Sequence, residues 1–200
     1  MKKTFETLGI IAFVAVIGFA LATCSNGSTT PPGTTPITYA IGDTGPGGGI
    51  VFYDKGEYTD GWRYLEAASD DQGTMAWCNC ASYSRCTVTD AVGTAIGTGK
   101  ANTTAIIVAH PDDDYTNNAA KATQGTIGSK SDWFLPSVEE LKEMYKAIGK
   151  PGIPTTGFFW SSSEDKTNYT FAIGLGFDDG GSGSMDKDSG SDGVRAVRAF

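Results

Sequence analysis

The stretch that decides most about the fold is SVEELKEMYKAIG, residues 137–149. Ser137 and Glu140 have the spacing of a capping box, in which each side chain binds the backbone N–H of the other residue. Apolar residues then recur at i, i+3, i+4 and i+7, on one face of a helix: Leu141, Met144, Tyr145 and Ile148. Gly149 and Pro151 favour a helix end at this point. The sequence therefore predicts an amphipathic helix over residues 138–148.

The sequence that follows this helix has the pattern of β-strands. Phe158–Trp160 is a short aromatic strand, and apolar residues alternate with small ones over residues 169–177. Residues 194–200 predict a closing strand, with Arg195 and Arg198 on opposite faces. Residues 178–193, between the last two strands, are expected to form a loop.

The sequence before the helix adds a hairpin and a second helix. Residues 37–41 predict a short first strand, and a glycine-rich turn over residues 42–49 follows. Residues 50–53 and 62–67 are expected to pair as a hairpin, with a turn at 54–56. Residues 69–98 are expected to be loop-like, and residues 100–109 helical as far as Pro111. Strands with segregated helices predict an α+β fold with short antiparallel strands, two or three helices and long loops.

The first 36 residues indicate export. Lys2 and Lys3 precede an apolar run over residues 8–22, too short to span a membrane but typical of a signal peptide. The run ends in Leu-Ala-Thr-Cys, which resembles the lipobox of bacterial lipoproteins and implies lipidation of Cys24. The alternative is an ordinary cleaved signal with an incidental Cys24. We expect a signal peptide over residues 1–23, a lipidated Cys24 with a flexible tether over 24–36, and one domain over 37–200.

Composition narrows the classes of function. The net charge is −8, which argues against a nucleic-acid partner. The chain has 27 glycines, 11% aromatic residues, one histidine and four cysteines. A glycine-rich, acidic and aromatic chain with few catalytic residue types favours a binding module over an enzyme.

Five blocks of sequence resemble the DUF1566 family, also called the Lcl C-terminal domain family after a collagen-like bacterial adhesin. The blocks occur in family order: GDTGPGGGIVFY at 42–53, AIGTGKAN at 95–102, SDWFLPS at 131–137, FWSSSE at 159–164 and VRAVRAF at 194–200. The resemblance implies a C-type-lectin-like fold, related in shape to formylglycine-generating enzymes. It also implies a non-catalytic surface adhesin.

The expected protein is thus a lipoprotein held to the membrane by its lipid, at the cell surface or the periplasmic face. It would bind a glycan, or a host or matrix protein. The alternatives are a structural envelope protein without a soluble ligand and, less favoured, an enzyme of the formylglycine-generating fold. That chemistry uses a cysteine pair near the C-terminal core, and this chain has no cysteine beyond Cys86.

Three local patterns resemble chemical sites. His110 precedes three aspartates, but no nucleophile elbow accompanies it, so no catalytic residue is predicted. Gly93–Lys100 resembles a phosphate-binding loop, but Thr94 and Ala101 stand where glycine and a hydroxyl residue are required. Cys78, Cys80 and Cys86 lack the paired spacing of a zinc site, and Cys86 is expected to form a disulfide with Cys78 or Cys80.

The acidic 178–193 loop is the predicted ligand surface. Its aspartates are candidates for binding a ligand or calcium, because hard cations bind carboxylate oxygens on flexible loops. The five candidates are Asp178, Asp179, Asp186, Asp188 and Asp192. Residues 112–114 are a weaker second candidate. The favoured alternative is an acidic, solvated hairpin loop, so no cofactor is predicted.

Overall fold

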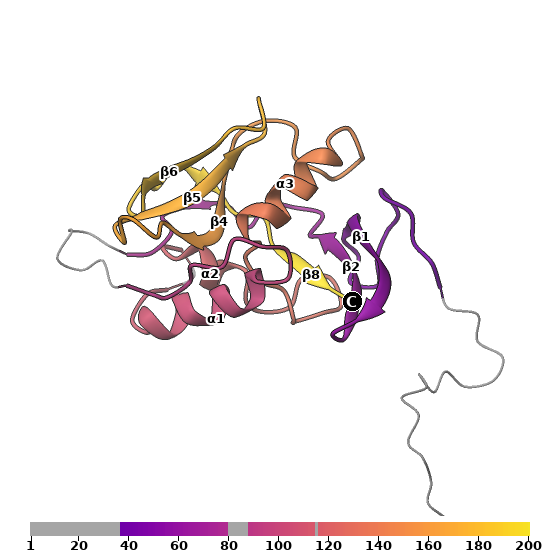
Figure 1. Ribbon diagram of the computed structural model, residues 1–200, viewed down its shortest axis with the longest axis horizontal. Helices are drawn as coiled ribbons and strands as arrows, with labels where there is room; N and C mark the ends of the chain where they lie inside the picture. The colour runs from indigo at the N-terminus through magenta and orange to yellow at the C-terminus, as the bar shows by residue number, and fades with distance from the viewer. Residues whose placement is uncertain (1–36, 80–87, 115) are drawn as a thin grey trace, which may run out of the picture. The chain divides into compact units, whose positions relative to one another are not determined.

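The computed structural model describes residues 37–79, 88–114 and 116–200. The chain divides into two units, Met1–Ile37 and Thr38–Phe200, and the second unit contains all of the described helices and strands. These elements are two sheets and three helices (Figure 1). Along the chain they are β1 (Ile50–Thr59), β2 (Trp62–Ala67), β3 (Thr74–Met75), α1 (Gly99–Ala109), α2 (Ala119–Ala122), α3 (Val138–Lys146), β4 (Phe158–Glu164), β5 (Phe171–Gly176), β6 (Ser182–Asp186), β7 (Asp192–Gly193) and β8 (Val197–Ala199). The α+β class is confirmed.

The strands form a three-stranded sheet in the order β1-β2-β8 and a five-stranded sheet in the order β3-β7-β4-β5-β6. Strand β8 pairs antiparallel with β2, with Leu65 opposite Ala199 and Ala67 opposite Val197. In the second sheet β5 pairs antiparallel with both β4 and β6, whereas the contact between β4 and β7 is parallel. Strand β8, near the C-terminus, therefore pairs with the β1–β2 hairpin, which forms at the start of the domain.

Helix α3 contacts strands of both sheets, whereas α1 and α2 pack together and α1 also contacts β4 (Figure 1). The predicted capping box is present, since Ser137 Oγ accepts from Glu140 N and the Glu140 side chain accepts from Ser137 N. Leu141 and Met144 are buried in the core between α3 and the sheets. The helix ends at Lys146, before Ile148, which is 40% exposed.

The expected strand at residues 37–41 and the expected turn at residues 54–56 are both wrong. Residues 37–41 form no strand, because Ala40 and Asp43 close a turn in which Ala40 N donates to Asp43 Oδ2 at 2.8 Å. Strand β1 runs through the expected 54–56 turn to Thr59, with an irregular register after Asp54. The chain reverses at Asp60 and Gly61, which both have positive φ, 52° and 85°.

The C-terminal part contains more β-structure than expected. Residues 178–193 are not one loop: β6 pairs with β5 along five positions, and β7 pairs with β3. Serine and glycine dominate β6, whose first three side-chain positions are exposed. Such a strand gives no apolar alternation, and its pairing depends on backbone hydrogen bonds. Among the described residues, no helix has the length and apolar character needed to cross a membrane.

Candidate functional site

The glycine-rich turn before β1 wraps around the buried side chain of Glu66. Gly47 N lies 2.9 Å from Glu66 Oε1, and Gly49 N lies 3.0 Å from Oε2. A Cβ on Gly45 would lie 2.4 Å from Glu66 Oε2, and one on Gly47 would lie 2.6 Å from Oε1. These glycines are required because the backbone must approach the carboxylate closely. The GDTGPGGGIVFY block thus has a structural role, which is to bind the buried carboxylate of Glu66.

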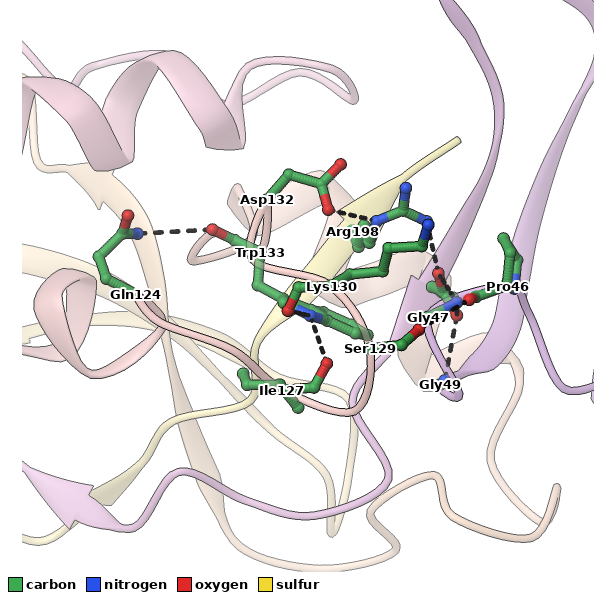
Figure 2. Close-up of polar contacts among 11 residues, drawn as sticks. Pro46, Gly47, Gly49, Gln124, Ile127, Ser129, Lys130, Asp132, Trp133 and Arg198 are labelled. Carbon is green, nitrogen blue, oxygen red and sulfur yellow. Dashed lines mark hydrogen bonds and ion pairs between the residues drawn. The ribbon is translucent and has the colours of Figure 1, made fainter.

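Arg198 connects this turn to the segment that precedes Trp133 (Figure 2). Its Nη1 donates to Glu66 Oε1 at 2.9 Å, and its Nε donates to Asp132 Oδ1. Burial alone would raise the pKa of Asp132, but the hydrogen bond and charge of Arg198, with the charge of Lys100, hold it below its usual value. Asp132 is therefore a fixed carboxylate at neutral pH.

The Trp133 indole holds the 127–130 turn beside the same network (Figure 2). Its Nε1 donates to the carbonyl oxygens of Ile127 and Lys130, at 3.0 and 3.1 Å. Gln124 Nε2 donates to Trp133 O at 3.4 Å, and this hydrogen bond anchors the segment that precedes the 127–130 turn. The Trp133 residue is 3% exposed, so it is a core residue rather than a ligand-stacking surface.

The FWSSSE block is also structural. Trp160 Nε1 donates to Met75 O, Ser161 Oγ to Ile173 O and Ser163 Oγ to Gly93 O. Glu164 forms a buried ion pair with Lys187, whose ammonium lies 4.5 Å from the centre of the Trp77 ring. Ser163 thus binds loop backbone at Gly93, whereas Ser161 binds a carbonyl oxygen within β5.

A pocket of about 360 Å³ opens where the β1–β2 hairpin faces the start of α1. Its volume lies within the range of small-molecule sites. We call it the Trp62 pocket. Its lining combines apolar side chains with charged ones: Asp60, Gly61, Trp62, Leu65, Gly97, Lys100, Asp132, Phe134, Glu140 and Ala199.

A second pocket of about 280 Å³, the Gln124 pocket, adjoins the first. Both pockets are lined by Lys100, Asp132 and Phe134. The other lining residues are mostly polar: Thr103, Thr104, Ile107, Gln124, Ser131 and Trp133. The two pockets are therefore adjacent, with Lys100, Asp132 and Phe134 between them.

Several polar groups around this shared wall have no partner among the described residues. Lys100 is exposed, and no described side chain forms an ion pair with its ammonium. Asp132 Oδ2 points away from Arg198, and the Asp132 side chain is 44% exposed (Figure 2). No described residue accepts a hydrogen bond from the indole N–H of Trp62, whose ring carries Lys55 Nζ at 3.9 Å from its centre. The site can therefore both donate to and accept from a ligand.

Glu140 closes the floor of the Trp62 pocket. Its Oε1 accepts from Gly97 N at 2.8 Å and its Oε2 from Ser137 N at 2.7 Å, so one carboxylate serves the starts of both α1 and α3. Burial raises the pKa of Glu140 despite these hydrogen bonds and a further one from Gly99. The Gly93–Lys100 stretch, which resembles a phosphate-binding loop, therefore already binds the carboxylate of Glu140.

The five predicted aspartates are not assembled into one site. Asp178 Oδ2 accepts from Gly157 N and Asp179 Oδ1 from Gly181 N, so both brace turns. Asp186 ends β6, Asp188 is exposed, and Asp192 is buried in β7 with a pKa that burial raises. The described residues contain no group of three or more His, Cys, Asp or Glu side chains placed to hold a metal ion.

The second acidic candidate also stabilises local structure. Asp113 Oδ2 accepts from Asn79 N and Asn118 Nδ2, both at 2.9 Å. Asp114 Oδ1 accepts from the hydroxyl and backbone N–H of Thr116, which lower the Asp114 pKa. His110 is buried beside them, and its Nε2 has no hydrogen-bond partner among the described residues.

The cysteine predictions fall partly outside the described residues. Cys78 is buried and disulfide-bonded. Cys24, Cys80 and Cys86 all lie outside the described residues, so the pairing of Cys86 with Cys78 or Cys80 and the lipidation of Cys24 stay predictions.

Sequence reasoning missed the pocket pair because its residues come from six separate segments. In the sequence, Lys100 stands out only as part of a phosphate-like loop, and Trp62 only as part of a hairpin. A usable signal was Lys100, the one charged residue of the AIGTGKAN block. No model of a known protein family matches the chain, and no curated protein matches it. The structure thus defines an α+β domain with a two-pocket surface site, and the DUF1566 resemblance rests on the sequence blocks alone.

Proposed function

We propose that this chain is a non-catalytic binding module that holds its ligand in the Trp62 and Gln124 pockets. The observation that carries the proposal is their shared wall. There the exposed ammonium of Lys100, without a partner among the described residues, lies beside a carboxylate that Arg198 fixes in place. Preorganised polar groups around a small apolar surface are what ligand sites typically offer.

The same proposal includes the setting of the module. The export signal and lipobox of the sequence support a lipoprotein held to the envelope through Cys24. The order of the five sequence blocks supports a C-type-lectin-like fold, and the short antiparallel strands, three helices and long loops of the described residues agree with it. The ligand would be a glycan, or a host or matrix protein.

The test is a binding screen with the full-length chain, purified in mild detergent and immobilised. It is presented with a glycan array and with a panel of matrix proteins. Lys100→Met removes the ammonium and keeps most of the side-chain volume. Lys166→Met is the matched control, because Lys166 is exposed and lines neither pocket.

We expect the wild type and Lys166→Met to bind a common ligand, and Lys100→Met to bind it at least about tenfold more weakly. Tenfold corresponds to about 1.4 kcal/mol, at the lower edge of a charge-assisted hydrogen bond. Equal binding by Lys100→Met would show that the pockets are not the site. A chain that binds nothing in either panel, but cross-links in envelopes to one stoichiometric partner, would be a structural protein instead.

A further inference from the structure

Lys100 and Asp132 offer complementary hydrogen-bonding groups to the same space. Lys100 lies in the first turn of α1, and Asp132 lies just before the buried Trp133. An ammonium only donates and a carboxylate only accepts, whereas a hydroxyl does both. Two neighbouring hydroxyl groups therefore satisfy this pair together, one accepting from Lys100 and the other donating to Asp132.

The geometry of Asp132 suits this role. Arg198 engages only Oδ1, which leaves Oδ2 for a ligand, and Arg198 is itself fixed by Glu66 at 2.9 Å. A ligand that donates to Oδ2 meets an acceptor already held in position, so little side-chain entropy is lost on binding.

The pocket linings match the two kinds of surface on a sugar. Trp62 and Ala199, which are partly exposed and pack on the buried Leu65 and Phe134, give the Trp62 pocket an apolar wall for C–H groups. The Gln124 pocket adds the hydroxyl of Ser131 and the amide oxygen of Gln124, whose Nε2 is already used by protein acceptors. A chain of hydroxyl-bearing rings would thus find polar groups along its length and an apolar surface at one end.

The local charge argues against an anionic ligand. Lys55 pairs with Asp60 and Arg198 with Asp132, but the four carboxylates in and behind the pocket walls, Asp60, Glu66, Asp132 and Glu140, still outnumber the three cations, Lys55, Lys100 and Arg198, in a chain of net charge −8. A sulfated or polyuronic chain would place its anions near these carboxylates, and like charges in close proximity are costly. A neutral ligand avoids this repulsion.

We infer that the site takes a neutral oligosaccharide of at least two units, which spans both pockets, with vicinal hydroxyls bound by Lys100 and Asp132. This inference rests on the proposed function and names its ligand class. Since an ammonium and a carboxylate perform the recognition, binding involves no metal ion.

The experiment is calorimetric titration of the full-length chain with neutral glucan, mannan, galactan and chitin oligosaccharides of one to four units. A heparin fragment and a hyaluronan fragment serve as anionic probes. Lys100→Met and Asp132→Asn test the pair, and thermal melting of each variant checks its fold. Lys166→Met and Asp188→Asn are matched controls, because both parent residues are exposed and outside the pockets.

We expect one neutral series to bind, with affinity rising at least fivefold from one unit to two and unchanged in EDTA. Lys100→Met should weaken it about tenfold or more, with both controls unchanged. No gain from one unit to two would overturn the two-pocket span, and loss of binding in EDTA would overturn metal-free recognition.

Other outcomes separate this inference from the proposed function. Binding of only the anionic fragments, or of only a matrix protein, that Lys100→Met abolishes would overturn the neutral-sugar assignment and leave the binding module standing. Sugar binding lost in Asp188→Asn but kept in Lys100→Met would move the site to the 178–193 segment. Absence of any ligand in both experiments would overturn both proposals.

Discussion

Gly47 shows how a single residue without a side chain positions the network behind the site. Its N–H donates to Glu66, and the same carboxylate accepts from Arg198, which holds Asp132. The sequence predicted a glycine-rich turn at residues 42–49, but it could not reveal that the turn closes on a glutamate 19 residues away. That contact depends on tertiary packing rather than on local preference.

Gly47→Ala should destabilise the protein by about 1–3 kcal/mol, as overpacking does in a filled site. Its Cβ would lie 2.6 Å from Glu66 Oε1 and 2.9 Å from Trp133 Cζ2. Urea unfolding measures the change. Gly183→Ala is the control, because a Cβ there meets nothing within 4 Å. Equal unfolding midpoints for both variants would contradict the account of the turn.

His110 makes stability dependent on pH. Burial lowers its pKa, an effect that Lys187 and Lys121 reinforce and Asp113 and Glu164 oppose. The folded state therefore binds a proton less readily than the unfolded chain, whose histidine has a pKa near 6.5. The stabilising effect of the neutral ring is complete above pH 6.5 and is lost as the pH falls below it.

We therefore expect the free energy of unfolding to fall between pH 7 and pH 5 more steeply in wild type than in His110→Phe. Chemical denaturation at several pH values measures it. His110 is the chain's only histidine, so the difference between the two curves isolates its titration. If the two curves of unfolding free energy against pH ran parallel, His110 would be protonated equally in the folded and unfolded states.

At the scale of elements, α3 was the most predictable part of the fold because its start signal is local. Ser137 and Glu140 need only each other's backbone to define the first turn. Helix α2 was not predicted, because four residues give no periodicity, and its start depends on Asn118, which accepts from Lys121 N. Strand β6 was missed for a similar reason, since its serines and glycines carry no apolar pattern.

Ser137→Ala should cost about 1 kcal/mol, the usual effect of removing an N-cap side chain. The variant loses the hydroxyl that accepts from Glu140 N and donates to Ala95 O. Ser182→Ala, at an exposed position of β6, is the matched control and should be neutral. A thermal midpoint shared by wild type and Ser137→Ala would show that Glu140 alone caps the helix.

At the scale of the whole molecule, the sequence predicted the α+β class but not the site. The class follows from local patterns that repeat along the chain. The pockets instead arise where the β1–β2 hairpin, the start of α1 and the segment before α3 come together. The predicted aspartates share one stretch of sequence, yet Asp178 and Asp179 accept from the backbone of different turns.

The disulfide of Cys78 should contribute about 2–4 kcal/mol, as disulfides in small domains commonly do. A reducing agent should therefore lower the thermal midpoint of wild type and leave that of Cys78→Ser unchanged. Peptide mapping under non-reducing conditions should find Cys78 joined to Cys86. A midpoint that reductant does not change would show that this bond adds no stability.

Strand β8 has a consequence for the order of events during synthesis. Residues 197–199 complete the sheet begun by β1 and β2, and Arg198 supplies the ion pair of the buried Glu66, 132 positions earlier. A growing chain that has released its first hairpin still lacks this partner until residue 198 emerges. The β1–β2 hairpin therefore cannot complete its sheet, or pair Glu66 with its arginine, before residue 198 has been synthesised.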